Sequence, residues 1–373
     1  MRSTIIIAGA GLSSPAGVKG RRPQYNFNRS RTKWGEIMDL DYHYGTVYVL
    51  SRWARFCAAN ANIIATSSQL VDDNIDDNPF SDAEEERNIA QGIKVRYSCQ
   101  NVWGNVTGKG NCEVWIPFHF LPGLEGERQA DKLICKKNSV LANKLRDRLL
   151  ATTLDNGSFG FRLGVGLHVY ADTWAHQEFA GLNNMVNVVK NLIFGKQGST
   201  VDKMIDMVMD SALAKKINSS LGPLGHMAAV HCPDMPFLWW KSGERFTDGR
   251  KNWDEFLEAS EAIYRILQQV SQEPVTGLTS EQQNMLVTCF KGIQSDDINV
   301  RYNEWLKRIH DNYFNFADFS DEDAQISYDK STIIGDIDFR RAFYEEVNSH
   351  FDWVRHELKD NYGIDVLQAE PIY

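Results

Sequence analysis

Three side chains that commonly bind metals recur at intervals of four residues in one apolar stretch, residues 161–181, FRLGVGLHVYADTWAHQEFAG. They are His168, Asp172 and His176. On an α-helix, residues four and eight positions apart lie on one face, so two imidazoles and a carboxylate would project into one strip of space. The spacing predicts either a metal site or a buried helix with two hydrogen-bonded histidines and a capping Asp. The rest of the chain must distinguish the two.

The composition is that of a globular protein, because 43% of the 373 residues are hydrophobic and 24% are charged. A formal net charge of -9 argues against a broad nucleic-acid-binding surface. Bound cations could still accept a phosphate. No apolar run approaches the roughly 20 residues of a membrane-spanning helix, so we expect no stable membrane insertion. The oligomeric state is left open.

The N-terminal residues and the cysteines bear on location and chemistry. The start, MRSTIIIAGAGLSSPAG, has one Arg and a short apolar patch, which makes a poor secretory signal. We therefore expect a chain that is cytoplasmic or exported by a non-classical route. Six cysteines are scattered without a C-x2-C pair, so a zinc knuckle or a redox motif is not supported, and we interpret them as free thiols.

Apolar spacing predicts a mainly α-helical protein with one domain, since neither a repeat nor a clear linker is found. Helices are expected near residues 44–57, 61–71, 127–153, 161–181, 183–195, 200–218, 253–272, 280–293, 300–313 and 339–362, with a short strand at 4–8 and a loop on a helical frame at 81–123. We divide the chain into an N-terminal arm (1–38), a metal-binding helical core (39–245) and a C-terminal helical layer packed on the core (246–373).

The histidines separate into two sets. Three of them, His310, His350 and His356, fall in charged amphipathic helices, where solvated or helix-terminal roles are expected. The other six lie in the first two thirds of the chain: His43, His119, His168, His176, His226 and His231. Most of these six have acidic neighbours, and zinc favours imidazole nitrogen completed by carboxylate oxygen.

The acidic partners are distributed along the same region. Asp39 and Asp41 precede His43, and Asp234 follows Pro233 in a broken loop. Asp72 and Asp73 end a predicted helix in the run DDNIDDN, which lacks the Gly and terminal Glu of an EF-hand loop. His119 lies between Pro117 and Pro122 in an apolar loop, a setting that is costly unless the ring has a partner.

The order of these ligand types resembles the zinc-dependent phospholipase C and single-strand-specific nuclease superfamily. The resemblance covers residues 39–240 and rests on the phrases HYGTVYVLSRWA, SQLVDDN, IPFHF and HVYADTWAHQEFAGL. It extends to a large bacterial family of uncharacterised function that looks like a diverged branch of the superfamily. The matching positions are His43, Asp72 or Asp73, His119, His168, Asp172, His176, His226 and Asp234.

The resemblance implies packed helices around a cleft with two or three zinc ions, and hydrolysis of phosphate esters. Such ions activate water and stabilise the leaving oxygen, so no protein nucleophile is needed. In this interpretation Asp172 bridges two ions, and Asp72 is a ligand and a proton acceptor. The substrate stays open between a phospholipid headgroup, single-stranded nucleic acid and a phosphomonoester. The run Phe237–Trp240 could stack bases or meet acyl chains, although core packing is its commonest fate.

The sequence also departs from the superfamily pattern. The superfamily binds one zinc through an N-terminal Trp, whereas about forty residues precede His43 here. We expect Asp41, or failing that Asp39, to supply the missing donor. The spacing from Asp172 to the next His is four rather than the six usual in the superfamily, and His231 rivals His226 as a ligand near Asp234.

Two other functions compete with this one. A non-catalytic protein stabilised by metal needs closed coordination, and structural zinc sites favour Cys-rich ligand sets that this chain lacks. An HD-type phosphohydrolase needs an adjacent His-Asp pair, and the chain has only His310-Asp311 in a late charged helix. We therefore favour a zinc-dependent phosphoric ester hydrolase.

Overall fold

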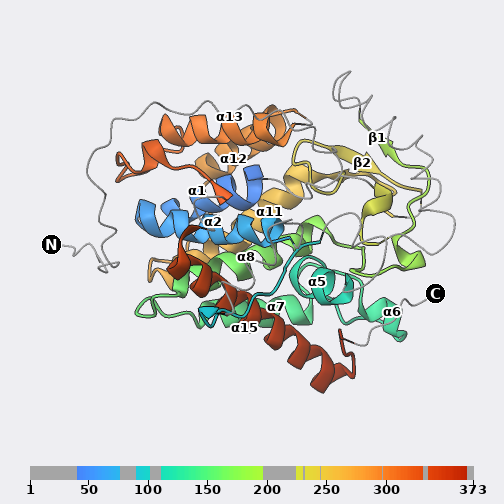
Figure 1. The fold of residues 1–373 in the computed structure, drawn as a ribbon. Helices are drawn as coiled ribbons and strands as arrows, with labels where there is room; N and C mark the ends of the chain where they lie inside the picture. Colours follow the sequence, from blue (N-terminus) through green and yellow to red (C-terminus); the bar gives the residue numbers. More distant parts are fainter. Residues whose placement is uncertain are drawn as a thin grey trace, which may run out of the picture.

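Helix α8 (Phe159–Ala175) is enclosed on all sides, since every residue in it except Arg162 is buried. A helix that is apolar all round must be surrounded by other elements. In the structure, a computed structural model, helices α2, α11, α15, α7 and α5 all contact α8 (Figure 1). His168 and Asp172 of the predicted motif therefore lie at the centre of the molecule.

The structure describes residues 40–75, 90–100, 111–195, 224–229, 232–243, 245–295, 297–330 and 335–367. The predicted strand at 4–8, the arm, the helix at 200–218 and the candidate ligands Asp39 and His231 lie outside these residues. The described part is mainly helical and forms a single compact domain, which confirms the predicted fold class.

The elements follow one another along the chain with short connections. They are η1 (Asp41–Thr46), α1 (Val47–Trp53), α2 (Ala58–Asp73), α5 (Asn111–Phe118), α6 (Gln129–Lys132), α7 (Val140–Leu150), α8, η2 (Met185–Asn187), β1 (Ile193–Phe194), η3 (Met227–Ala229), β2 (Trp239–Lys241), β3 (Arg250–Lys251), α11 (Asn252–Val270), α12 (Ser280–Gly292), α13 (Ile298–His310), η4 (Asp323–Gln325) and α15 (Ile337–Tyr362). The three strands form one antiparallel sheet in the order β1-β2-β3.

Two predicted helices differ from the structure. The helix predicted at 127–153 is interrupted, because Ser139 accepts a hydrogen bond from the amide of Ala142 and starts α7 afresh. The helix predicted at 183–195 is wrong. The side chain of Asn187 bonds to the backbone of Ala180 and Leu182 and fixes a turn, after which β1 pairs with β2. Such side-chain bonds offer the backbone an alternative to a helix.

A close crossing of α2 and α8 brings two predicted ligand helices together. At Gly164 a Cβ atom would lie 2.5 Å from the carbonyl oxygen of Ile64 and 2.9 Å from the amide nitrogen of Ser68. Only glycine fits there, because both atoms belong to the backbone and cannot rotate away. The crossing brings the C-terminal half of α2, which ends at Asp72 and Asp73, alongside α8.

The C-terminal helices pack on the core and share its largest hydrophobic cluster. That cluster joins Leu50 and Val169 with Ile263 and Phe351, from both sides of the predicted boundary at residue 245. A second cluster around the sheet contains Trp115, Phe179, Phe237, Leu238 and Trp240. Most of the aromatic run Phe237–Trp240 is thus core, the fate that the sequence favoured.

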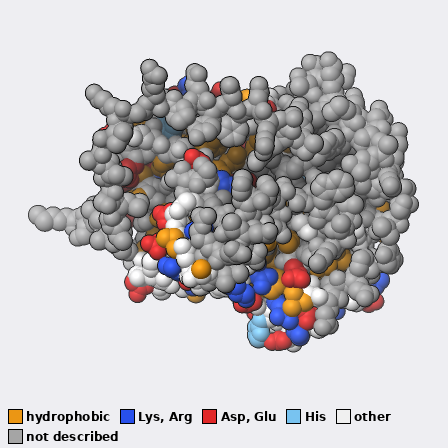
Figure 2. All heavy atoms as spheres, in the orientation of Figure 1, with side chains coloured by type: hydrophobic (Ala, Val, Ile, Leu, Met, Phe, Trp, Pro, Cys, Tyr) orange, Lys and Arg blue, Asp and Glu red, His pale blue; other side chains and the backbone are white. Residues whose placement is uncertain are grey.

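The surface of the described part carries charges of both signs. Figure 2 shows acidic and basic side chains interspersed at the lower edge of the molecule, where α15 lies in Figure 1. Among the described helices, none combines the length and the hydropathy needed to cross a membrane.

A candidate metal centre

Three groups of buried side chains in the described residues could each hold a metal ion. In every group the potential ligand atoms lie within 4.8 Å of one another. The groups are His43, His168 and Asp172; Asp72, His119 and His168; and His176, His226 and Asp234. We refer to them as the first, second and third groups. Together they contain eight of the predicted ligands, drawn from six separate segments of the chain.

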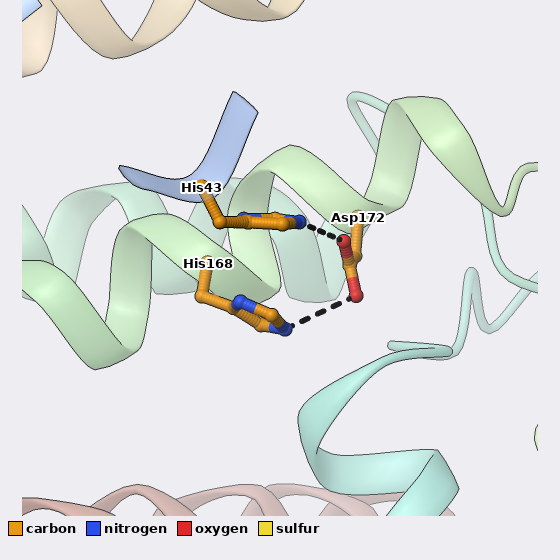
Figure 3. Close-up of side chains that lie close together, drawn as sticks. All are labelled: His43, His168 and Asp172. Atoms are coloured by element: carbon orange, nitrogen blue, oxygen red, sulfur yellow. Dashed lines mark ion pairs between the residues drawn. The ribbon is translucent and has the colours of Figure 1, made fainter. Parts of the chain in front are cut away.

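The first group joins α8 to the N-terminal element η1. Residues 41–46 form a π-helix, a rare conformation that occurs often at functional sites. The ring of His43 stacks on that of His168, with centroids 4.0 Å apart. Figure 3 shows the Asp172 carboxylate at the edge of both rings, with Oδ1 3.2 Å from Nε2 of His43 and Oδ2 3.4 Å from Nε2 of His168.

The second group adds Asp72, near the C-terminus of α2, and His119, which directly follows α5. The sequence predicted a loop flanked by prolines around His119. Instead, Pro117 lies inside α5 and the ring leaves from the helix end. Oδ1 of Asp72 lies 3.7 Å from Nδ1 of His119 and 3.6 Å from Nε2 of His168. Oδ2 of Asp172 lies 3.1 Å from the same His119 nitrogen, so Asp172 borders this group as well.

The third group is built mainly from loops. His176 is the residue at which α8 ends, and not a member of its last turn as the spacing predicted. Its Nε2 lies 3.1 Å from Oδ1 of Asp234, and Nε2 of His226 lies 3.3 Å from Oδ2 of the same carboxylate. Nδ1 of His176 is 3.5 Å from Oδ2 of Asp172. The three groups therefore form one connected centre.

Hydrogen bonds to the backbone fix which nitrogens of two rings carry protons. Nε2 of His119 lies 2.9 Å from the carbonyl oxygen of Ser98, and Nδ1 of His176 lies 2.7 Å from the carbonyl oxygen of His119. A carbonyl oxygen only accepts, so these nitrogens donate, and the other nitrogen of each neutral ring presents a lone pair. In both rings that lone pair faces carboxylate oxygens. Metal-binding histidines are held by the backbone in this way.

Burial makes charge on these groups costly. It raises the pKa of Asp172 well above its ordinary value, and the nearby carboxylates of Asp72 and Asp234 raise it further. Burial, with a smaller contribution from His176, lowers the pKa of His43 to about 3 and that of His119 well below its ordinary value. The pKa of His168 is also well below its ordinary value, first because of burial and then because of His43. The rings are therefore neutral near pH 7.

Neutral rings beside buried carboxylates fit a cation better than they fit a proton. The lone pairs of His119 and His176 would repel the facing carboxylate oxygens unless a positive centre lay between them. A proton on Asp172 would satisfy one of its ring contacts, whereas a divalent ion can be shared among several donors. In addition, Nδ1 of His43 and Oδ1 of Asp172 are buried and make no hydrogen bond to any described residue. The donor set therefore fits zinc.

A small cavity adjoins the first and third groups. It touches His43, Asp172 and Asp234, and apolar residues form most of its wall. The other lining residues are Tyr42, Ala171, Trp174, Ala175, Phe256 and Ala259.

The structure does not bring two of the predicted ligands into any group. Asp41 was expected to replace the N-terminal donor, but its Oδ2 accepts a hydrogen bond at 3.2 Å from Nε of the buried Arg301. The carboxylate of Asp73 points away from Asp72 and accepts a hydrogen bond at 2.6 Å from the hydroxyl of Tyr328. Of the alternatives Asp72 and Asp73, Asp72 is the one near the histidines.

The three late histidines lie outside the groups. The prediction for His350 is wrong, because this side chain is buried and its Nε2 donates to the carbonyl oxygen of Pro117. His310 is half-buried and bonds to the carbonyl oxygen of Ile326, and His356 is exposed and pairs with Asp360. The sequence also missed Ser98, whose contribution to the centre is a backbone carbonyl that no side-chain pattern reveals.

Comparisons with known proteins give one match. A family model described as "Family of unknown function (DUF6765)" matches residues 38–361. Searches of curated proteins and of solved structures gave no match. The matched segment begins just before η1 and ends inside α15, so it contains every described group of the centre. The chain belongs to the DUF6765 family.

Proposed function

We propose that this protein is a metal-dependent phosphoester hydrolase whose centre binds two or three divalent ions, with zinc as the preferred ion. The observation that carries the proposal is the position of Asp172. Its Oδ1 faces His43, while its Oδ2 faces His119, His168 and His176. A carboxylate with donors on both sides is suited to bridge two ions. The resemblance to zinc-dependent phospholipases C and nucleases supports the same role.

The residues would share the work as follows. His43, His168 and Asp172 would hold one ion, Asp72 and His119 with His168 and Asp172 a second, and the third group a third. Bound divalent ions would lower the pKa of water and neutralise charge on the phosphoryl oxygens. Asp72, close to two rings of the second group, would hold its ion and accept a proton from the attacking water. The backbone acceptors at Ser98 and His119 would orient the rings.

Donor chemistry supports zinc over the alkaline-earth ions. The described groups combine imidazole nitrogens with carboxylate oxygens, whereas calcium and magnesium favour all-oxygen shells. The apolar wall of the adjoining cavity, with Tyr42, Trp174 and Phe256, is compatible with a phosphoester that carries an apolar or aromatic leaving group. Phospholipid headgroups, single-stranded nucleic acid and phosphomonoesters are the substrates to compare.

One observation favours a second candidate, a non-catalytic protein that metal ions stabilise. Every ligand of the three groups is buried, with 7% exposure at most, at His226. Structural metal sites are closed, while catalytic ones keep a position open to substrate. The number of donors argues the other way, since eight ligands exceed what one structural ion requires. Turnover decides between the two.

The test is metal analysis followed by activity assays. Protein purified without chelator is expected to hold two or three equivalents of zinc. It is then assayed with bis-nitrophenyl phosphate, nitrophenyl phosphate, phosphatidylcholine and single-stranded DNA. Less than one equivalent after zinc supplementation would refute the metal centre, and a full complement without turnover on any substrate would favour the non-catalytic protein.

The substitution Asp172→Asn separates the centre from the fold. The amide cannot supply the charge that a bridging ligand needs, so we expect loss of at least one ion and loss of hydrolysis by at least about 100-fold, with the helical circular dichroism retained. Asp323→Asn is the matched control, because Asp323 is a buried carboxylate that pairs with Arg52 outside the centre. This control should lose stability and keep its zinc. Activity that survives in Asp172→Asn would locate the chemistry elsewhere.

A further inference from the structure

The third group depends on a turn that a single amide side chain holds. Asn252, the first residue of α11, is fully buried. Its Nδ2 lies 2.5 Å from the carbonyl oxygen of Cys232, 2.8 Å from that of Met235 and 3.4 Å from that of Pro233. Because carbonyl oxygens only accept, the amide nitrogen must face them.

The opposite side of the same amide is also fixed. Oδ1 of Asn252 accepts a hydrogen bond at 3.0 Å from Nε1 of Trp240, whose indole is fully buried. The indole nitrogen is only a donor, so the orientation of the Asn252 side chain is determined at both ends. The three carbonyls come from the residues on either side of Asp234. The amide therefore fixes the backbone from which the Asp234 carboxylate projects towards His176 and His226.

A buried cation from the neighbouring strand fixes the other loop of the group. Nη1 of Arg250 donates to the carbonyl oxygen of Ala175 at 2.8 Å, and Nη2 donates to that of Trp174 at 2.9 Å. These are the last two residues of α8, where carbonyls lack partners within the helix. A cation there is also favoured by the helix dipole. The next residue is His176, so Arg250 fixes the point from which its ring leaves the helix.

These three residues form one unit. Trp240 on β2 pairs directly with Arg250 on β3, and Asn252 begins α11 two residues later. We propose that Trp240, Arg250 and Asn252, together the anchor, are positioning residues for the third group and are not needed by the other two groups. The proposal rests on the function proposed above, since it requires that the third group binds an ion.

The reason for this selectivity is the way the ligands are mounted. The ligands of the first two groups project from η1, α2 and α8 or directly follow α5, and these helices pack against one another. In the third group Asp234 lies in a turn, and His226 follows Gly225, which has a φ of +51°. A ligand on a loop keeps its place only if other contacts hold that loop. Loss of such supporting contacts commonly weakens metal affinity by about 10- to 100-fold.

The test is the substitution Asn252→Asp in the full-length protein. The carboxylate still accepts from Trp240 but cannot donate to the three carbonyls. We expect zinc content to fall by one equivalent, or one zinc to bind about 10- to 100-fold more weakly in competition with a chromophoric chelator, while the remaining zinc keeps its affinity. Gln268→Glu is the matched control. Gln268 is a buried amide that bonds to Thr276 and Gly277 in a loop whose residues belong to none of the three groups.

The outcomes separate the two proposals. Wild-type protein without zinc would overturn both the proposed function and this inference. A folded Asn252→Asp variant with the full wild-type complement and affinity would overturn this inference alone. So would an equal loss of zinc in Gln268→Glu, because the effect would then reflect general destabilisation. If Asn252→Asp does not fold, Trp240→Phe decides, since it removes only the indole donor. Selective weakening of one zinc in that variant supports the anchor, and unchanged affinities overturn it.

Discussion

Asp172 is the residue on which the candidate centre converges. Its two carboxylate oxygens lie within 3.5 Å of a ring nitrogen from each of four histidines, His43, His119, His168 and His176. Burial and the nearby carboxylates of Asp72 and Asp234 oppose its ionisation, so the arrangement is costly without a cation. A side chain placed at such a cost is more economically explained by metal binding than by packing.

Asp41 has a different environment from the one expected of a ligand. Both Asp41 and Arg301 are buried, with 2% exposure each, and they form an ion pair. Burial raises the pKa of Asp41, and Arg301 opposes that shift. The pair connects α13 to the π-helix that carries His43. Its role is therefore to hold η1 in place, while His43 faces Asp172.

We expect Asp41→Asn to lower the free energy of unfolding by about 3–5 kcal/mol, because it leaves the Arg301 guanidinium buried without its counter-charge. Zinc content should stay at the wild-type value. Urea unfolding gives the stability and elemental analysis the metal. The double variant Asp41→Asn with Arg301→Met should be more stable than the sum of the single effects, since neither charge is then left alone. Loss of one zinc in Asp41→Asn would instead restore the ligand role suggested by the sequence.

At the scale of elements, the contact between α2 and α8 brings the ligands of the second group together. The two helices approach closely at Gly164, on the turn of α8 before His168. Their separation determines how near Asp72 comes to the histidine rings. Helix packing and ligand geometry are therefore coupled at this position.

We expect Gly164→Ala to destabilise the fold by about 1–3 kcal/mol, because the new methyl group would meet backbone atoms of α2. The separation of the helices should also weaken zinc binding at the second group. The matched control is Gly157→Ala, where an added Cβ has nothing within 4 Å. That variant should stay within about 0.5 kcal/mol of wild type. Equal unfolding midpoints for the two variants would contradict the proposed close contact.

Helix α15 is tied to the centre through His350. This buried ring donates to the carbonyl oxygen of Pro117 in α5, two residues before His119. Burial, with a smaller contribution from Arg148, lowers the pKa of His350 to about 3. The folded protein therefore resists protonation of this ring, whereas an unfolded chain takes up the proton near pH 6.5.

The sign of the pH dependence follows from these two values. Below pH 6.5 the unfolded state binds the proton and the folded state does not, so the contribution of His350 to stability is lost as pH falls towards 3. Replacing it by Gln keeps a donor for the Pro117 carbonyl and removes the titration. We expect wild type to lose about 2 kcal/mol more than His350→Gln between pH 7 and pH 5. Urea unfolding at both pH values measures this, and parallel losses in the two proteins would contradict it.

At the scale of the whole molecule, the centre connects parts of the chain that are far apart in sequence. Its ligands come from residues 43 to 234, and helices α11 and α15 close around the same central helix. A metal ion bound there would link these segments in the folded state only. Its binding free energy would therefore add to the stability of the fold.

We expect removal of metal by a chelator to lower the midpoint of thermal unfolding, and zinc to restore it. At free zinc 1,000-fold above the dissociation constant, one ion adds about 4 kcal/mol. Differential scanning calorimetry with and without zinc measures the shift. Asp172→Asn serves as the reference, because its smaller metal complement should reduce the effect of zinc. Identical midpoints with and without metal in wild-type protein would count against ions in the folded centre.

The sequence by itself determined the features that depend on local spacing. Apolar periodicity predicted α8, α11, α12, α13 and α15 close to their observed bounds, since a helix buries residues at a fixed interval. The interval of four between His168, Asp172 and His176 likewise predicted that these side chains would lie together. The structure brings them into adjoining groups, although α8 ends at His176 itself.

Only the tertiary structure decided the features that depend on partners far away in the chain. It selected Asp72 over Asp73, because Tyr328 binds the carboxylate of Asp73. It paired Asp41 with Arg301, 260 residues later, and buried His350 against α5. It also placed the anchor behind the third group. A charged or polar side chain is satisfied by whichever partner the fold brings within hydrogen-bonding distance, and short-range periodicity carries no information about that partner.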